Sequence, residues 1–128
     1  MNGLSDMQRL WPEPVPLKGY GNGAFRFEEE RVEGAICILP GGIFRWRPQR
    51  LEDVTEADFA AGLAAVREVD FLLFGMGSVH LPPPAFLVRA CALAGIGLEC
   101  MTTGAAVRTY NVCRDEERLP ATFLLPVE

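Results

Sequence analysis

The feature that most constrains the fold is a pair of short apolar runs flanking a helical segment. Residues 71–74 and 96–101 have the length and composition of buried strands. Between them, prolines 82–84 introduce the helical pattern of residues 85–94, and Gly95 follows where a helix C-terminal cap is expected. A strand, a crossover helix and a second strand form a right-handed unit with parallel strands. The sequence therefore predicts an α/β domain.

Further strands and helices are predicted on both sides of this unit. Residues 35–39 form an apolar run, and residues 43–46 alternate after a Pro-Gly-Gly turn, so the two runs are expected to form a hairpin. Thr55 has the position of an N-cap for a helix with apolar residues at helical spacing. The remaining predicted elements are a strand at 24–27, a short helical segment carrying Arg108 and Asn111, and a closing strand at 120–125.

The length of 128 residues predicts one domain with one sizeable core. Prolines at positions 12, 14 and 16 exclude an interior strand or helix from the first residues. We expect residues 1–18 to form an extended arm, which lies on the domain surface or reaches a partner. Residues 19–128 then form the single α/β domain.

The balance of charge disfavours nucleic acid as a partner. Seventeen acidic against twelve basic residues give a formal net charge of −5, the wrong sign for neutralising phosphates. Basic residues do gather in one stretch, at Arg26, Arg31, Arg45, Arg47 and Arg50, with Glu28, Glu29, Glu30 and Glu33 among them. A solvated mixed-charge surface and an anion-binding patch are the two interpretations of this stretch.

Neither a membrane span nor a metal site is predicted. No apolar run approaches the roughly 20 residues that a spanning helix needs, and no signal peptide pattern precedes the arm, so we expect a cytoplasmic protein. The cysteines lack C-x-x-C spacing, which indicates buried reduced thiols without a metal or cofactor. His80 is the only histidine, and no orienting acid accompanies it, so no catalytic set is predicted.

Two segments carry the candidate binding residues. The Gly75-Met76-Gly77 turn follows a strand and is interpreted either as a structural turn or as a small-ligand loop. In the segment 101–111, hydroxyls can cap a helix, and Arg108 offers a donor fork for a carboxylate of the protein, a ligand or a partner. The candidate residues are Gly75, Gly77, Ser78, Met101, Thr102, Thr103, Arg108, Tyr110 and Asn111, with Trp46 as a further aromatic contact.

Several of these segments together carry a resemblance to a known family. The residues concerned are 21–27, 34–46, 74–77 and 101–111, followed by Glu117-Arg118 and residues 124–127. Over about residues 17 to 128 the chain resembles the small-domain family, formerly of unknown function, that includes mitochondrial complex I assembly factor 3 and the adipogenesis-associated domain protein. The resemblance implies a compact three-layer α/β domain with a central mixed β-sheet flanked by helices.

For function, the resemblance implies a non-enzymatic interaction protein. It would act as an assembly factor for a respiratory NADH dehydrogenase complex, with respiratory complex subunits as partners and a peripheral place at a membrane. One alternative is a small-molecule-binding or enzymatic domain that uses a cleft between the Gly75–Ser78 loop and the Met101–Asn111 segment. Another is a homodimer formed through the apolar helix at 85–94.

Overall fold

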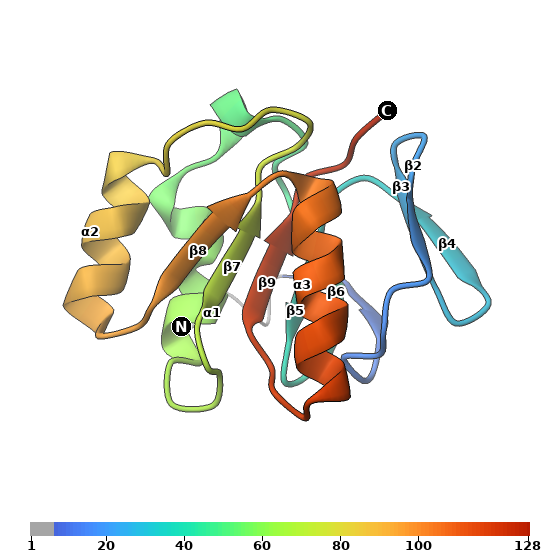
Figure 1. Ribbon diagram of the computed structural model, residues 1–128, viewed down its shortest axis with the longest axis horizontal. Coiled ribbons are helices and arrows are strands. Elements are labelled where there is room, and N and C mark those ends of the chain that lie inside the picture. Colours follow the sequence, from blue (N-terminus) through green and yellow to red (C-terminus); the bar gives the residue numbers. More distant parts are fainter. Residues whose placement is uncertain (1–6) are drawn as a thin grey trace.

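A computed structural model describes residues 7–128 and places a six-stranded mixed sheet at the centre of the molecule (Figure 1). Residues 1–6, the first part of the predicted arm, lie outside the described residues. In spatial order the strands are β1 (Arg9–Trp11), β6 (Gly42–Arg45), β5 (Ile36–Leu39), β9 (Ala121–Leu124), β7 (Leu72–Gly75) and β8 (Leu98–Met101). The strands from β1 to β9 pair antiparallel, and β9, β7 and β8 pair parallel. The predicted mixed sheet is confirmed.

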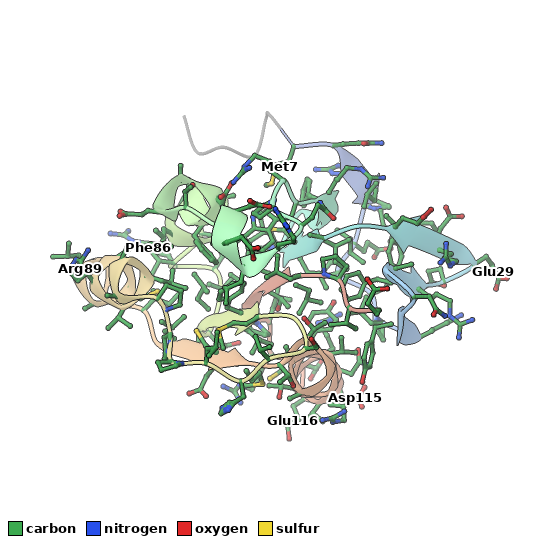
Figure 2. The ribbon with its side chains drawn as sticks, turned by 90° about the horizontal axis from the view of Figure 1, so that it is seen from above. Met7, Glu29, Phe86, Arg89, Asp115 and Glu116 are labelled. Atoms are coloured by element: carbon green, nitrogen blue, oxygen red, sulfur yellow. The ribbon has the colours of Figure 1, made fainter. Side chains whose placement is uncertain are left out.

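Helices cover both faces of this sheet, which gives the predicted three layers (Figures 1 and 2). One face carries two short 3-10 helices and two α-helices: η2 (Leu51–Asp53), η3 (Glu56–Phe59), α1 (Ala60–Ala64) and α2 (Ala85–Ala94). The other face carries α3 (Thr103–Asp115) and a small antiparallel sheet of β2 (Gly19–Gly21), β3 (Ala24–Phe27) and β4 (Glu30–Glu33).

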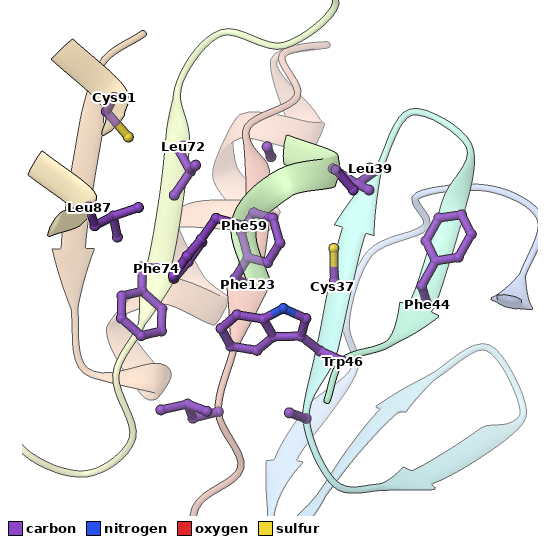
Figure 3. Packing of buried hydrophobic residues seen from close by; sticks show 14 of the residues in the cluster. Cys37, Leu39, Phe44, Trp46, Phe59, Leu72, Phe74, Leu87, Cys91 and Phe123 are labelled. Atoms are coloured by element: carbon purple, nitrogen blue, oxygen red, sulfur yellow. The ribbon is translucent and has the colours of Figure 1, made fainter. Parts of the chain in front are cut away.

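An aromatic cluster fills the first face (Figure 3). Trp46 lies with its ring centroid 5.3 Å from that of Phe59 and 5.1 Å from that of Phe123. Its indole Nε1–H donates to the carbonyl oxygen of Asp58 at 2.8 Å, so its polar atom is satisfied inside the core. The arrangement joins the 3-10 helix η3 to β6 and β9.

On the second face, α3 packs Ala106, Val107 and Tyr110 against the sheet and against the small sheet. Phe25 and Phe27 of β3 are fully buried there. A two-residue Asn-Gly turn closes the β2–β3 hairpin, with φ of 53° at Asn22 and 74° at Gly23. These positive φ values fit a hairpin turn whose twist matches that of the strands.

One helical prediction needs correction, and the bounds of another are confirmed. The helix expected from Thr55 begins as a 3-10 turn with a capping box between Thr55 and Asp58 and ends at Ala64. The helix at 85–94 has its predicted bounds, and Gly95 caps it at φ 73°. α2 lies at one end of the molecule, where its Leu87 and Cys91 are buried and its Leu93 is 90% exposed (Figure 1).

The described part of the predicted arm lies along the domain. Arg9–Trp11 forms β1 at the sheet edge, where the prolines that follow do not interrupt an interior ladder. Leu17 is buried at 4% exposure against the second face. Residues 9–17 therefore contribute to the packed structure, while the boundary at residue 18 stays a prediction.

Chain direction creates a topological switch point at β7. The connection from β7 to β8 runs through α2 on one face, and the connection from β8 to β9 runs through α3 on the other (Figure 1). Ligands of open α/β sheets bind at such points, outside the carboxyl ends of the strands. The predicted residues after β7 and β8 lie at this place.

Candidate interaction surface

Hydrogen bonds join the two loops at the switch point. The Met76 N–H donates to the Met101 carbonyl at 2.8 Å, and the Thr103 N–H donates to the Gly77 carbonyl at 2.8 Å. Thr103 is fully buried, and its hydroxyl accepts from the Gly77 N–H at 2.9 Å and donates to the Leu125 carbonyl at 2.7 Å. The structure thus brings the two segments together by bonding them to each other.

Gly75 lets α3 approach the end of β7. A Cβ atom at this position would lie 3.1 Å from the Cα of Thr103 and 2.8 Å from Cδ2 of Leu124. Only a residue without a side chain fits between the strand and the helix without displacement. Gly75 therefore has a packing role between β7 and α3.

The remaining residues of this group lie at the surface of the same edge. Thr102 is the N-cap of α3, and its side chain accepts from the Ala105 N–H at 3.4 Å. Ser78 begins an exposed loop in which Val79 and Leu81 are each 47% exposed. At this edge of the sheet the side chains of Thr102 and Ser78 face solvent, while the backbone groups of the two loops are hydrogen-bonded to each other.

Tyr110 and Asn111 hold the arm. Asn111 forms two hydrogen bonds with Leu17, accepting from its N–H at 2.9 Å and donating to its carbonyl at 2.8 Å. The Tyr110 hydroxyl donates to the Val15 carbonyl at 2.8 Å. Burial raises the pKa of Tyr110 well above its ordinary value, against a smaller lowering by Arg114. Both predicted site residues have their polar groups engaged within the chain.

Trp46 does not join the other predicted residues. It lies in the aromatic cluster on the first face, whereas Tyr110 belongs to the cluster on the second face. Its side chain is 2% exposed, and its N–H already donates to Asp58. The sheet separates it from Arg108 on α3.

Arg108 lies on the outer face of α3, together with residues one turn away. Its side chain is exposed, and within residues 7–128 no hydrogen bond or ion pair engages its guanidinium. Four positions along, Val112 is 56% exposed on the same helix face. Four positions back, Gly104 is covered by Tyr20, whose ring carbon Cζ lies 3.0 Å from where a Cβ would stand.

We call Tyr20, Gly104, Arg108 and Val112 the α3 stripe. Tyr20 is 43% exposed, so the stripe offers an aromatic ring, a cation and an aliphatic side chain in a row. Tyrosine and arginine are enriched among residues that dominate protein interfaces. The geometry suits contact with another protein.

Sequence reasoning missed Tyr20, because its glycine neighbours indicate a loop. The available signal was the Asn-Gly pair, which marks a two-residue hairpin turn and puts residues 19–21 in a strand. Alternation then sends the side chain of Tyr20 to the face shared with its strand partner Phe25, toward α3.

The cysteines are held in their neutral form. Burial raises the pKa of Cys37 well above its ordinary value. Burial, with smaller effects of Cys91 and Glu99, raises the pKa of Cys100 to about 12. Over residues 7–128, His, Cys, Asp and Glu form no group of three that could hold a metal ion.

Within the described part of the chain, no helix combines the length and the apolar character that a bilayer crossing requires.

The fold defines a class of protein with solved members. The structure is similar to the crystal structure of an outer membrane protein from Bartonella henselae, with a TM-score of 0.83 and 34% identity over 92% of this chain and 99% of that chain. The class is thus a compact α/β domain with a mixed sheet between helical layers. Residues 17–125 match the family described as "Protein of unknown function (DUF498/DUF598)", and the chain belongs to that family.

Curated relatives agree with the resemblance seen in the sequence. An uncharacterised protein of Rhodobacter capsulatus is 36% identical over 88% of this chain and 86% of its own length. NADH dehydrogenase [ubiquinone] 1 alpha subcomplex assembly factor 3 of Rattus norvegicus is 24% identical over 96% of this chain. The chain spans 66% of the length of that relative.

Proposed function

We propose that this protein is a non-enzymatic interaction domain that helps to assemble a respiratory NADH dehydrogenase complex. The α3 stripe is its contact surface, and Arg108 binds an acidic group of a complex subunit. Under this proposal the protein acts in the cytoplasm and meets the membrane only through its partner.

The observation that carries the proposal is the exposed Arg108 on α3, one helical turn from the exposed Val112 and one turn from Gly104, which Tyr20 of β2 covers. A solvated guanidinium that pairs with no carboxylate in the described part of the chain is available for a bidentate bond to a partner. The flanking ring and aliphatic side chain supply apolar contact around that bond. The name of the Rattus norvegicus relative supports the kind of partner, since that protein is called an NADH dehydrogenase assembly factor.

The hydrogen bonds at the switch point also favour contact over enclosure of a ligand. A cleft between the Gly75–Ser78 loop and the Met101–Asn111 segment would require breaking the bonds between Gly77 and Thr103. A thermal-shift panel of nucleotides and organic acids tests this alternative. A ligand present at a hundred times its dissociation constant would add about 2.7 kcal/mol to the free energy of unfolding.

The homodimer alternative has its own surface on α2, where Val88 is 47% exposed and Leu93 is 90% exposed. Sedimentation velocity of the wild type and of Leu93→Asp tests it. A dimer that becomes monomeric in the variant would support pairing through α2, and a monomeric wild type would contradict it.

The assembly proposal predicts a selective effect of Arg108→Ala. Affinity capture of the tagged wild type from its native cells should recover NADH dehydrogenase subunits, and the variant should lose them. Because no ion pair or hydrogen bond engages the Arg108 guanidinium within residues 7–128, we expect the melting temperature of the variant to stay within about 1 °C of that of the wild type.

Arg67→Ala is the matched control, because Arg67 is another exposed arginine and lies outside the α3 stripe. The control should capture the same subunits as the wild type. Equal capture by Arg108→Ala would contradict the role of the stripe, and a large fall in its melting temperature would show that Arg108 is structural. A wild type that recovers no such subunits would contradict the assembly function itself.

A further inference from the structure

Two arginines face each other on the outer surface of the small sheet. In the strand register Gly19 of β2 stands opposite Arg26 of β3, and Arg26 stands opposite Arg31 of β4. Both arginines are exposed. Phe25 and Phe27, which flank Arg26 on β3, turn to the core. Like charges directly opposite on neighbouring strands destabilise a sheet. This pair therefore needs a compensating feature.

The chain itself supplies little compensation. Over residues 7–128, no hydrogen bond or ion pair joins the Arg26 side chain to a carboxylate. Arg31 reaches Glu33 only at 4.0 Å, with the two side chains 50% and 77% exposed, and it donates to the Asn22 carbonyl at 3.3 Å. Ion pairs at such exposure contribute little to stability.

The backbone beside the pair forms a hollow of about 320 Å³. Its lining consists of the two arginines and residues of the β2–β3 hairpin, and it includes no carboxylate. Glycine at position 19 leaves room for this side chain, since a Cβ would lie 3.1 Å from Nε and 3.2 Å from Nη2 of Arg26. The guanidinium of Arg26 thus lies over a bare stretch of backbone.

Acidic residues of the β3–β4 turn lie close by but leave this hollow free. Glu28, Glu29 and Glu30 border a second hollow of about 450 Å³, which Lys18 and the two arginines also line. Glu29 marks the tip of the turn at the far end of the molecule from α2 (Figure 2). The arginines therefore stand between an acidic rim and a hollow that no carboxylate lines.

We propose that Arg26 and Arg31 together bind an oxyanion group, a carboxylate or a phosphate, on the outer face of the β2–β3–β4 sheet. Each guanidinium presents a planar donor fork that matches such a group, and an anion between the two forks removes their mutual repulsion. The two arginines lie on the outer face of the small sheet, which points away from the face that packs on α3, and Tyr20 is the one residue of the α3 stripe that also lines the hollow. The proposed anion site does not depend on the proposed assembly function.

The direct test follows the side-chain Nε–Hε signals of Arg26 and Arg31 by NMR in the full chain. Inorganic phosphate and sodium acetate are titrated separately, with sodium chloride of equal ionic strength as the reference. Saturating shifts with phosphate, acetate or both, lost in Arg31→Gln, support the site and tell which oxyanion it takes. Shifts that match those in chloride overturn it.

Thermal unfolding gives a second readout that a merely structural pair would not produce. Without oxyanion at low ionic strength, Arg31→Gln should melt about 1–3 °C higher than the wild type, because the like-charge pair is gone. Whichever of phosphate and acetate binds should raise the melting temperature of the wild type and of Arg67→Gln but not that of Arg31→Gln. Two results together would overturn the proposal. One is a melting temperature of Arg31→Gln below that of the wild type without oxyanion, and the other is an equal change of melting temperature with each salt in all three proteins.

Discussion

Among single residues, Thr103 connects the most parts of the switch point. Its buried hydroxyl bonds both the Gly77 N–H and the Leu125 carbonyl, so it joins the ends of β7, α3 and β9. A buried backbone group that loses its partner costs about 1–3 kcal/mol. This one side chain thus fixes three elements.

We predict that Thr103→Val lowers the free energy of unfolding by about 2–4 kcal/mol, since two backbone groups lose their partner at once. Thr109→Val is the matched control on the same helix, because the Thr109 hydroxyl contacts only the Met101 sulfur, at 3.4 Å. Urea unfolding followed by circular dichroism measures both variants. Equal losses of the free energy of unfolding in the two variants would contradict a specific stabilising role of the Thr103 hydrogen bonds.

A second prediction at this scale concerns Gly75. Gly75→Ala should cost about 1–3 kcal/mol, because the added methyl group overlaps Leu124 and the α3 backbone. Gly97→Ala serves as control, since the nearest atom to its added Cβ is Phe71 Cβ at 3.6 Å. Chemical denaturation of both variants checks the difference, and a tolerated Gly75→Ala would show that α3 can shift.

Among elements, the start of η3 depends on one carboxylate. The Asp58 side chain accepts from Arg47 at 2.9 and 2.7 Å, and from the N–H and the hydroxyl of Thr55 at 2.8 and 2.9 Å. Burial alone would raise the pKa of Asp58, but these donors outweigh it and hold the pKa below its ordinary value. The same residue's carbonyl accepts from Trp46.

A carboxyl group whose pKa is lower in the folded state stabilises the fold above its unfolded pKa, near 4, and loses that effect as the pH falls. We therefore predict that the melting temperature of the wild type falls between about pH 5 and pH 2. Asp58→Asn should have a lower melting temperature than the wild type above this range and a smaller fall within it. Melting temperatures across this range measure the effect. An equal fall of the melting temperature in the two proteins would contradict this prediction.

Elements with local signals could be predicted from the sequence. Thr55 with Asp58 marks a helix start, Gly95 marks a helix end, and the apolar runs mark β5 and β7. The candidate site was less accessible, because Asn111 and Leu17 are 94 positions apart in sequence. No local sequence pattern around Tyr110 or Asn111 indicates that the arm engages their polar groups. From the sequence alone, both side chains are therefore predicted to be available for binding.

At the scale of the whole molecule, β9 holds the sheet together. It pairs antiparallel with β5 on one side and parallel with β7 on the other, and all four of its residues are buried. Its position could not be predicted from local pattern, since strand order depends on pairing over long separations. Without β9 the sheet divides into β1–β6–β5 and β7–β8.

We predict that a chain ending at residue 119 does not fold cooperatively, because each half-sheet loses its central partner and much of its core. Removing residues 1–11 should leave a folded but less stable protein, since β1 is an edge strand. Dispersion of amide signals in NMR spectra distinguishes the two outcomes. A well-dispersed spectrum from the first truncation would contradict the central role of β9.

The late position of β9 in the chain also has a consequence for biosynthesis. A ribosome delivers β5 well before β9, and at about 5–20 residues per second the interval is on the order of ten seconds. During that time the emerging chain carries two unpaired strand edges, which other nascent chains can join. The rate of translation through residues 40–120 and the supply of chaperones should therefore influence how much native protein a cell obtains.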